Sequence, residues 1–132
     1  MKNFNLKVVT PDGLCFDSEI ESLLIRTDDG DVEFLAGHID YMASLGTGRA
    51  RIKEGGKDRY ASVSGGFVTV KGGEVKLVAI TFEFADQIDL ERAKAARDEA
   101  KAAISSSKDD KALTLAKAKL QRALSRIGVA EM

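Results

Sequence analysis

The chain has 132 residues, a length that suits one domain or two small modules, and its 20 basic and 21 acidic side chains leave a net charge of −1 at pH 7. The near-neutral charge gives no support for nucleic-acid binding, which normally needs a basic patch or stripe, and a single cysteine excludes an internal disulfide. No segment approaches the roughly 20 apolar residues that cross a bilayer, and residues 1–5 lack the apolar core of a secretion signal, so we expect no direct membrane insertion.

The composition changes sharply near residue 86. Eleven of the twelve glycines precede this point, whereas eleven of the seventeen alanines follow it. Residues 1–86 contain ten basic and fourteen acidic side chains, and residues 87–132 contain ten basic and seven acidic side chains, so the net charges are −4 and +3. We therefore expect two structural modules, at residues 1–86 and 87–132.

The first module consists of short β-branched or alternating runs separated by turn signals. Pro11-Asp12-Gly13 predicts a turn, because proline presets one dihedral angle and glycine accepts a positive φ. The expected strands cover residues 4–9, 23–25, 49–53, 60–64, 67–70 and 75–80. Strands at this close spacing, with no helical period between them, predict an antiparallel sandwich or barrel.

From Asp89 onward the apolar period becomes helical. Asp89 is a suitable N-cap, residues 105–107 interrupt the pattern, Asp109 or Asp110 can cap a second helix, and Gly128 suits its end. Two narrow apolar stripes result, one of Ala93, Ala96, Ala100, Ala103 and Ile104, the other of Leu113, Ala116, Leu120, Ala123, Leu124 and Ile127. They can face each other in an antiparallel hairpin. Contacts between alanines bury little area, so such a hairpin can either dock on the first module or open.

The sequence lacks the usual catalytic and metal-binding patterns. It has no phosphate loop, and His38 and Cys15 are its only histidine and cysteine, which excludes a metal cluster built on those residues. We expect Cys15 to fill the β core and His38 to lie in a loop or interface, rather than to form a nucleophile–base pair. The acidic residues 28–31 with Glu33 miss the spacing of a calcium loop and predict a solvated turn. No catalytic residue and no metal site is therefore predicted.

Three arginines of the second module break local preferences. Arg92 is the third residue of the first predicted helix, where its charge opposes the helix dipole, and Arg122 and Arg126 repel each other four residues apart. In an antiparallel hairpin the end of the second helix lies beside the start of the first, so the three converge near amides that attract anions. They form either an anion site or a solvated cationic surface whose stems cover apolar atoms.

Four stretches resemble one protein family, in order and over the whole chain. Ser64-Gly65-Gly66-Phe67 is similar to the Ser-Gly-Gly-Phe stretch of ATP synthase epsilon subunits (delta in mitochondria). Residues 30–38 resemble that family's loop ending in Gly-His, although Glu33, Ala36 and Asp40 stand where glycine and two prolines are usual. Residues 88–93, Ile-Asp-Leu-Glu-Arg-Ala, resemble the family's Ile/Leu-Asp-x-x-Arg-Ala motif, and residues 123–132 resemble the tail of Bacillus-like members.

The resemblance implies a β-sandwich of about ten strands followed by a two-helix hairpin, in a non-catalytic subunit of the central stalk. Its partners would be the gamma subunit and the c-ring, and the alpha and beta subunits when the hairpin extends and inhibits ATP hydrolysis. The complex would couple proton or sodium flow to ATP synthesis, with this subunit peripheral on the cytoplasmic face of the cell membrane. In a loop from Asp28 to Ala43, the implied c-ring and gamma contacts are Asp28, Asp31, Glu33, His38, Tyr41 and Met42.

The resemblance also implies that ATP is a regulatory ligand of the folded hairpin, with no cofactor required. The implied ATP-binding residues are Glu83, Ile88, Asp89, Arg92, Ala93, Arg122 and Arg126. Glu99 stands where the Bacillus-like members carry an arginine, which predicts weaker binding. A stand-alone nucleotide- or anion-binding module is the alternative reading of the arginine cluster, and a small Cys/His hydrolase is a more distant one.

Overall fold

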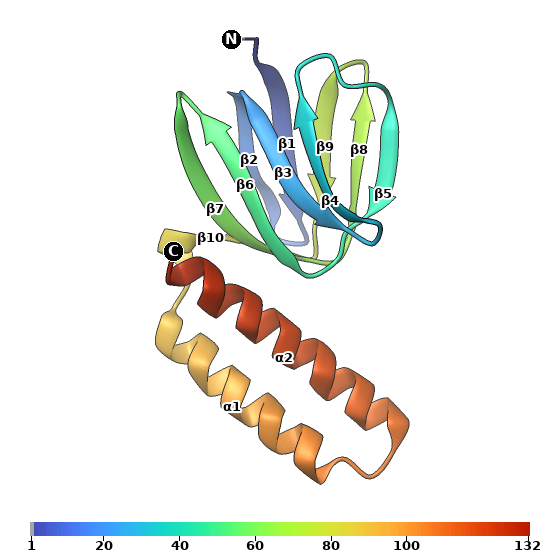
Figure 1. Cartoon of the computed structure of the whole chain (residues 1–132), viewed down its shortest axis with the longest axis vertical. Helices are drawn as coiled ribbons and strands as arrows, with labels where there is room; N and C mark the ends of the chain where they lie inside the picture. Colours follow the sequence, from blue (N-terminus) through green and yellow to red (C-terminus); the bar gives the residue numbers. More distant parts are fainter. Residues whose placement is uncertain (1) are drawn as a thin grey trace.

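The computed structural model describes residues 2–132, which form ten strands, one short 3₁₀ helix and two α-helices (Figure 1). One five-stranded sheet has the order β2-β1-β9-β8-β5 and the other has the order β10-β7-β6-β3-β4. The strands are β1 (Phe4–Thr10), β2 (Gly13–Ile20), β3 (Ser22–Thr27), β4 (Gly30–Leu35), β5 (Tyr41–Ser44), β6 (Gly48–Glu54), β7 (Lys57–Ser64), β8 (Phe67–Lys71), β9 (Glu74–Val78) and β10 (Thr81–Phe84). They precede η1 (Ala85–Gln87), α1 (Leu90–Ser106) and α2 (Asp110–Ala130).

The two sheets enclose one apolar core, which confirms a sandwich. Strand β1 shows the cause: Leu6 and Val8 are fully buried while Lys7 is exposed, since alternate side chains of a strand face opposite sides. The core consists of residues of both sheets, and Phe84 is the last of them in the sequence. The sheets are not entirely antiparallel as expected, because β1 and β9 pair in parallel, Leu6 to Val9 with Val75 to Val78.

The Ser-Gly-Gly-Phe stretch forms the turn between β7 and β8, and its second glycine cannot be replaced without a clash. Gly66 has φ +94°, and a Cβ atom there would lie 1.8 Å from the carbonyl oxygen of Val78. That residue ends β9, the strand that pairs with β8 directly after the turn. Two requirements therefore select glycine here: the positive φ and the close approach of another strand's backbone.

Local capping sets where both helices begin. The carboxylate of Asp89 accepts a hydrogen bond from the Arg92 amide at 3.1 Å, and that of Asp109 accepts one from the Ala112 amide at 2.7 Å. Between the helices, α1 ends at Ser106, as the serine run predicts. The two helices pack against each other as an antiparallel hairpin (Figure 1).

The seam between the helices is narrower than predicted. Ala93, Ala100, Ala116 and Ala123 are buried, but Ala103 is exposed and Leu124 is 47% exposed. The end predicted at Gly128 is wrong, because α2 continues to Ala130. The physical reason is tertiary: Ile127 and Val129, on either side of the glycine, are both buried, and their burial holds the last turn in place.

Helix α2 connects the hairpin to the sandwich. It packs on β7 and β6, and the hydroxyl oxygens of Ser62 in β7 and Ser125 in α2 lie 2.9 Å apart. This contact explains why residues 61–64 are all buried, although the alternating pattern predicts one exposed face. The outer face of this strand end is covered by the helix.

Cys15 does not lie in the core as predicted. Its side chain is exposed on β2, an edge strand, and its thiol donates a hydrogen bond to the carbonyl oxygen of Val8 at 3.4 Å. Partial burial raises the pKa of the Cys15 thiol, and a smaller effect from the backbone of Cys15 itself lowers it. A Cys15–His38 pair is also excluded by topology, because the His38 ring packs on Tyr41 of β5, at the opposite edge of that sheet.

Candidate functional site

An open hollow of about 560 Å³ lies where the start of α1 and the end of α2 meet the sandwich. Its wall combines the β1–β2 turn, strand β10 with the residues before it, and both helices. The lining residues are Thr10, Asp12, Ile80, Thr81, Phe82, Glu83, Gln87, Ile88, Asp89, Arg92, Ala93, Ala96 and Arg126. The structure therefore brings together six of the seven residues implied as ATP ligands, all except Arg122.

The first turn of α1 lines this hollow, and one of its backbone amides already has a hydrogen-bond acceptor within the chain. Asp89 caps the amide of Arg92, so that amide is not available to an external anion. The amides of Leu90 and Glu91 have no acceptor within the helix, as in every first turn. The hollow thus offers the positive end of one helix together with the side chain of Arg92, which is exposed.

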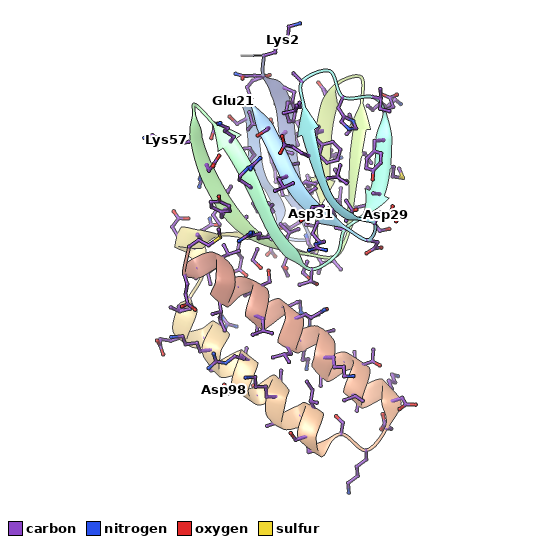
Figure 2. All side chains as sticks on the ribbon, in the orientation of Figure 1. Lys2, Glu21, Asp29, Asp31, Lys57 and Asp98 are labelled. Carbon is purple, nitrogen blue, oxygen red and sulfur yellow. The ribbon has the colours of Figure 1, made fainter. Side chains whose placement is uncertain are left out.

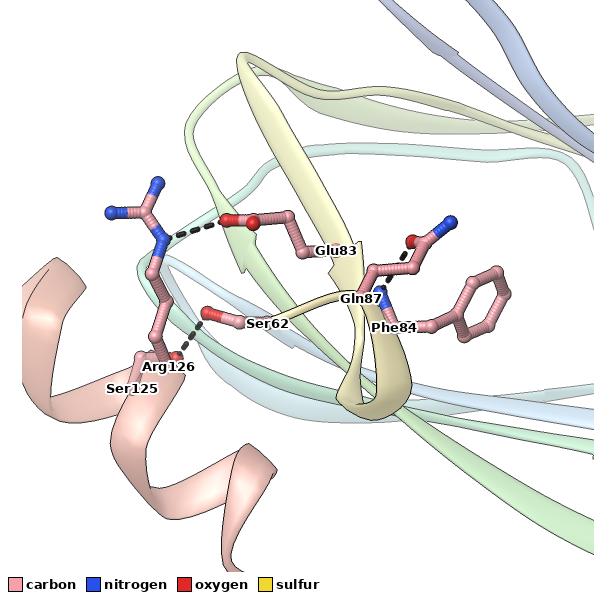
Figure 3. Close-up of polar contacts among 6 residues, drawn as sticks. All are labelled: Ser62, Glu83, Phe84, Gln87, Ser125 and Arg126. Carbon is pink, nitrogen blue, oxygen red and sulfur yellow. Dashed lines mark hydrogen bonds and ion pairs between the residues drawn. The ribbon is translucent and has the colours of Figure 1, made fainter. Parts of the chain in front are cut away.

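The most direct polar contact of the site joins the two modules. Arg126 Nε donates to Glu83 Oε1 at 2.6 Å, and the two side chains are 30% and 34% exposed (Figure 3). Glu83 of β10 is registered opposite Ser62 of β7, so two neighbouring strands present a carboxylate and a hydroxyl to adjacent residues of α2. The pair leaves the terminal guanidinium nitrogens of Arg126 directed away from Glu83 (Figure 3).

A hydrogen bond within the sandwich positions β10 and the entry to α1. The side-chain oxygen of Gln87 accepts from the Phe84 amide at 3.0 Å, which closes the single 3₁₀ turn after β10 (Figure 3). This turn places Ile88 and Asp89 directly beside the strand. Gln87 was not predicted as a site residue, although its position beside the Ile-Asp-x-x-Arg-Ala motif is a usable signal.

The remaining wall of the hollow is apolar. Ile80 is 64% exposed, and its side chain lies over Gly65, where an added Cβ would approach it to 2.7 Å. Phe82, Ile88 and Ala93 complete this apolar part. A site with an apolar wall and two guanidinium groups suits a ligand that carries both a flat apolar part and an anionic part.

Arg122 lies in a second, smaller hollow of about 200 Å³ between the two helices. It is lined by Ala96, Glu99, Ala100, Ala103, Lys119, Arg122 and Arg126, so it shares Ala96 and Arg126 with the first hollow. The prediction that the three arginines meet at one point is therefore wrong, and of the three only Arg126 lines both hollows. Sequence reasoning missed Lys119, although its spacing of three and seven residues from Arg122 and Arg126 places all three on one helix face.

The residues implied as stalk contacts do not form one loop. Most of residues 28–43 is strand β4 and strand β5, which belong to different sheets. Asp28 lies in the β3–β4 turn with Asp29, and Asp31 follows near the start of β4 (Figure 2 labels Asp29 and Asp31), whereas His38 follows the other end of β4. The expectation of one loop is thus wrong. The six-residue strand β4 separates the turn that contains Asp28 from the segment that contains His38 by about 17 Å.

The side chains of this set have different surroundings. Asp31 pairs with Arg26 at 3.1 Å and Glu33 pairs with Arg51 at 2.9 Å, which gives the acidic run partners other than a metal. Within residues 2–132 no group of three or more potential ligands is placed to hold a metal ion. The His38 ring packs edge-on against Phe34, with ring centroids 4.8 Å apart, and against Tyr41. Met42 is 71% exposed.

Comparison with known sequences identifies the family. A sequence profile described as "ATP synthase, Delta/Epsilon chain, beta-sandwich domain" matches residues 3–85, and one described as "ATP synthase, Delta/Epsilon chain, long alpha-helix domain" matches residues 86–131. The chain belongs to the ATP synthase delta/epsilon family, as an epsilon subunit. The ATP synthase epsilon chain of Bacillus velezensis is 40% identical over 98% of both chains. That of Bacillus subtilis is 42% identical over 83% of both chains.

Solved structures agree with this family. A chain in the mitochondrial ATP synthase of Euglena gracilis, solved as an OSCP/F1/c-ring assembly, has a TM-score of 0.83 and 26% identity, covering 98% of this epsilon chain and 82% of that chain. A chain of the Tetrahymena thermophila enzyme, with a TM-score of 0.69 and 12% identity, shares the fold and covers 98% of this chain and 97% of that one. Within residues 2–132 of the epsilon chain, neither helix is both long and apolar enough to span a membrane.

Proposed function

We propose that this epsilon subunit works in the central stalk of an F-type ATP synthase, bound to the gamma subunit and the c-ring. There it helps couple ion-driven rotation to ATP synthesis without catalysing a reaction itself. The similarity to a chain of an F1/c-ring assembly at 26% identity supports this place. The subunit is then peripheral, on the cytoplasmic face of the cell membrane.

The contact with the stalk is proposed for the segment that joins the two sheets, residues 35–42. Leu35, Ile39 and Met42 in this segment are all more than half exposed, and exposed apolar groups close together mark protein–protein contacts. The aromatic contacts of His38 with Phe34 and Tyr41 fix the shape of the segment from beneath. Asp28 in the β3–β4 turn, with Asp31 and Glu33 on β4, then forms a second, charged contact.

We further propose that the docked hairpin binds ATP and that the released hairpin inhibits ATP hydrolysis by reaching the alpha and beta subunits. The observation that carries the first part is the hollow between sandwich and hairpin, where Glu83, Asp89, Arg92 and Arg126 converge beside an apolar wall. A ligand that contacts both modules stabilises the docked state, because it binds that state alone. ATP would therefore favour turnover.

Calorimetry on the isolated subunit tests ATP binding. ATP should bind more tightly than inorganic phosphate, because only ATP fills the apolar part of the hollow. Arg92→Ala should weaken ATP binding about tenfold, as expected for the loss of a charge-assisted contact. Arg97→Ala is the matched control, because Arg97 lies on the same helix, lines neither hollow and pairs with Asp98.

Two results would contradict the proposal. One is that ATP binds no more tightly than inorganic phosphate, and the other is that Arg92→Ala and Arg97→Ala change the affinity for ATP equally. Co-purification with a gamma-type subunit separates the stalk role from a stand-alone anion-binding module, which predicts no such complex. A hydrolase reading would require ATP turnover that Cys15→Ala or His38→Ala abolishes.

A further inference from the structure

We infer that Asp40 is a positioning residue for the stalk contact, because its carboxylate ties the segment 35–42 to the β8–β9 turn. This inference rests on the proposed contact of that segment with the gamma subunit and the c-ring. It adds a residue that was not among the implied contacts, and it states what the side chain of that residue does.

Ile39 is the most exposed large apolar residue among residues 2–132, with 78% of its side chain accessible. A partner that covers such a side chain gains less affinity when the backbone beneath it must first be ordered in the complex. A segment that presents Ile39 to the stalk therefore binds more tightly if its backbone is already fixed. The residues on both sides of Ile39 are fixed in this way.

His38, directly before Ile39, is held against the sandwich. Its ring packs on Phe34 and Tyr41. Its amide donates a hydrogen bond to the carbonyl oxygen of Leu35 at 3.2 Å, and its Nδ1 atom lies 2.7 Å from the carbonyl oxygen of Ile39. These contacts fix the backbone on one side of the exposed apolar group.

Asp40, directly after Ile39, is held by its own side chain. Asp40 Oδ1 accepts a hydrogen bond from the Gly72 amide at 3.1 Å. The ladder between β8 and β9 ends at the pair Lys71–Glu74, so the Gly72 amide takes its acceptor from outside that ladder. Asp40 also directly precedes β5, the strand that pairs with β8. Its carboxylate thus extends the attachment of β5 to β8 beyond their paired residues.

The chain contains the same kind of contact a second time, on the other side of β3. Glu21 lies between β2 and β3, as Asp40 lies between β4 and β5, and both connections cross from one sheet to the other. Glu21 Oε1 accepts a hydrogen bond from the Gly56 amide of the β6–β7 turn at 2.8 Å. Both turns consist of two glycines with positive φ. Glu21 therefore provides a matched control that lies outside the segment 35–42.

Three variants of the full-length chain separate positioning from stability and from charge. Asp40→Ala removes the acceptor, whereas Asp40→Asn removes the charge but keeps a side-chain oxygen that can accept from Gly72. Glu21→Ala removes the matched hydrogen bond at Gly56. Urea unfolding measures the cost of each change to the fold, and NMR measures hydrogen exchange of the Gly72 amide. Surface plasmon resonance measures binding to an immobilised complex of the gamma subunit and the c-ring.

Asp40→Ala should weaken binding to the gamma and c-ring complex about fivefold, because the segment must then be ordered on binding. Asp40→Asn and Glu21→Ala should each bind within about twofold of the unaltered chain, although the two alanine variants should lose similar stability. Exchange of the Gly72 amide should become faster in Asp40→Ala alone. Ile39→Ala should weaken binding less in the Asp40→Ala chain than in the unaltered chain, since Asp40 acts through the position of Ile39.

The positioning role is wrong if Asp40→Asn weakens binding as much as Asp40→Ala, because the charge would then be the cause. It is also wrong if Glu21→Ala weakens binding equally, or if the effects of Ile39→Ala and Asp40→Ala are additive. Unchanged exchange of the Gly72 amide in Asp40→Ala would disprove the hydrogen bond whatever the binding result. If the unaltered chain does not bind the gamma and c-ring complex, the proposed stalk function is overturned, and the positioning role with it.

Discussion

The effect of single residues of this epsilon subunit depends on groups that are distant in the sequence. Gly66 is a clear case, since its missing side chain leaves room for the carbonyl of Val78. Glu99 is another, since its effect depends on the cations of α2 across the helical seam. In both cases a local property, the positive φ of Gly66 or the charge of Glu99, is visible at the residue itself. The size of its effect on stability or binding depends on a neighbour from another element.

Gly66→Ala should destabilise the sandwich by about 4 kcal/mol or more, because backbone must move to relieve the clash. Gly56→Ala is the control, with a positive φ of +77° but nothing within 4 Å of an added Cβ. Its cost should be about 1–2 kcal/mol, the strain of a left-handed conformation alone. Urea unfolding of both variants measures the difference, and equal losses would show that the approach of Val78 is unimportant.

Glu99→Arg should tighten ATP binding, because it replaces a repulsive group of the second hollow with an attractive one. The gain should be about 1 kcal/mol, roughly fivefold to tenfold in affinity, since the hollow is open to solvent. Asp98→Arg is the control: Asp98 is exposed on the same helix and lines neither hollow, so this change should have little effect. Calorimetry that finds the same change in both variants would assign the gain to net charge alone.

At the scale of elements, the hairpin combines two contacts of different kinds. The seam between α1 and α2 consists mainly of alanines, which bring the helices close but bury little area. The contact of α2 with the sandwich adds Ile127 and Val129, the Ser62–Ser125 hydrogen bond and the Glu83–Arg126 pair. Many of the contacts that dock α2 on the sandwich therefore lie in its last turns, the part nearest the proposed ATP site.

Ile127→Ala should release α2 more readily than Leu124→Ala, although the same apolar stripe was expected to include both residues. Ile127 is buried, so its truncation should cost about 2 kcal/mol or more, whereas Leu124 is half-exposed and should cost well under 1 kcal/mol. Limited proteolysis of the hairpin, together with its thermal unfolding followed by circular dichroism, compares the two. A larger effect of Leu124→Ala would mean that the hairpin packs differently in solution.

For the whole molecule, the sandwich is complete without the hairpin. Every residue of its apolar core lies at or before Phe84, and the guanidinium of Arg59 covers the Phe84 ring at 3.8 Å from within the sandwich. The hairpin has no comparable core of its own, and helices in proteins owe most of their stability to tertiary packing rather than to intrinsic propensity. Stability is thus concentrated in the module proposed to bind the stalk, and mobility in the module proposed to regulate.

A chain truncated after Asp86 should therefore fold and still assemble with the gamma subunit. Reassembled enzyme that contains it should hydrolyse ATP at least as fast as enzyme with the full chain, since the inhibitory element is gone. Circular dichroism, pull-down with gamma and a hydrolysis assay check the three parts. Failure to assemble would place stalk contacts on the hairpin, and equal hydrolysis under conditions where the full chain inhibits would count against the regulatory role.

Much of the architecture is local and was predictable from the sequence. The change from a two-residue to a helical period after residue 86, the turn glycines and the caps Asp89 and Asp109 act over a few residues each, so short windows reveal them. The resemblance to epsilon subunits, carried by ordered short motifs, is confirmed by the family profiles.

Only the tertiary structure decided what covers each face. Periodicity shows which side of an element is apolar but not which partner packs there, so Cys15, Leu124 and Gly128 were assigned wrongly. The Glu83–Arg126 pair spans 43 residues and exists only because α2 docks beside β10. For the same reason the sequence predicted that Arg92, Arg122 and Arg126 converge at one point, whereas the docking of two helices and a strand divided them between two hollows.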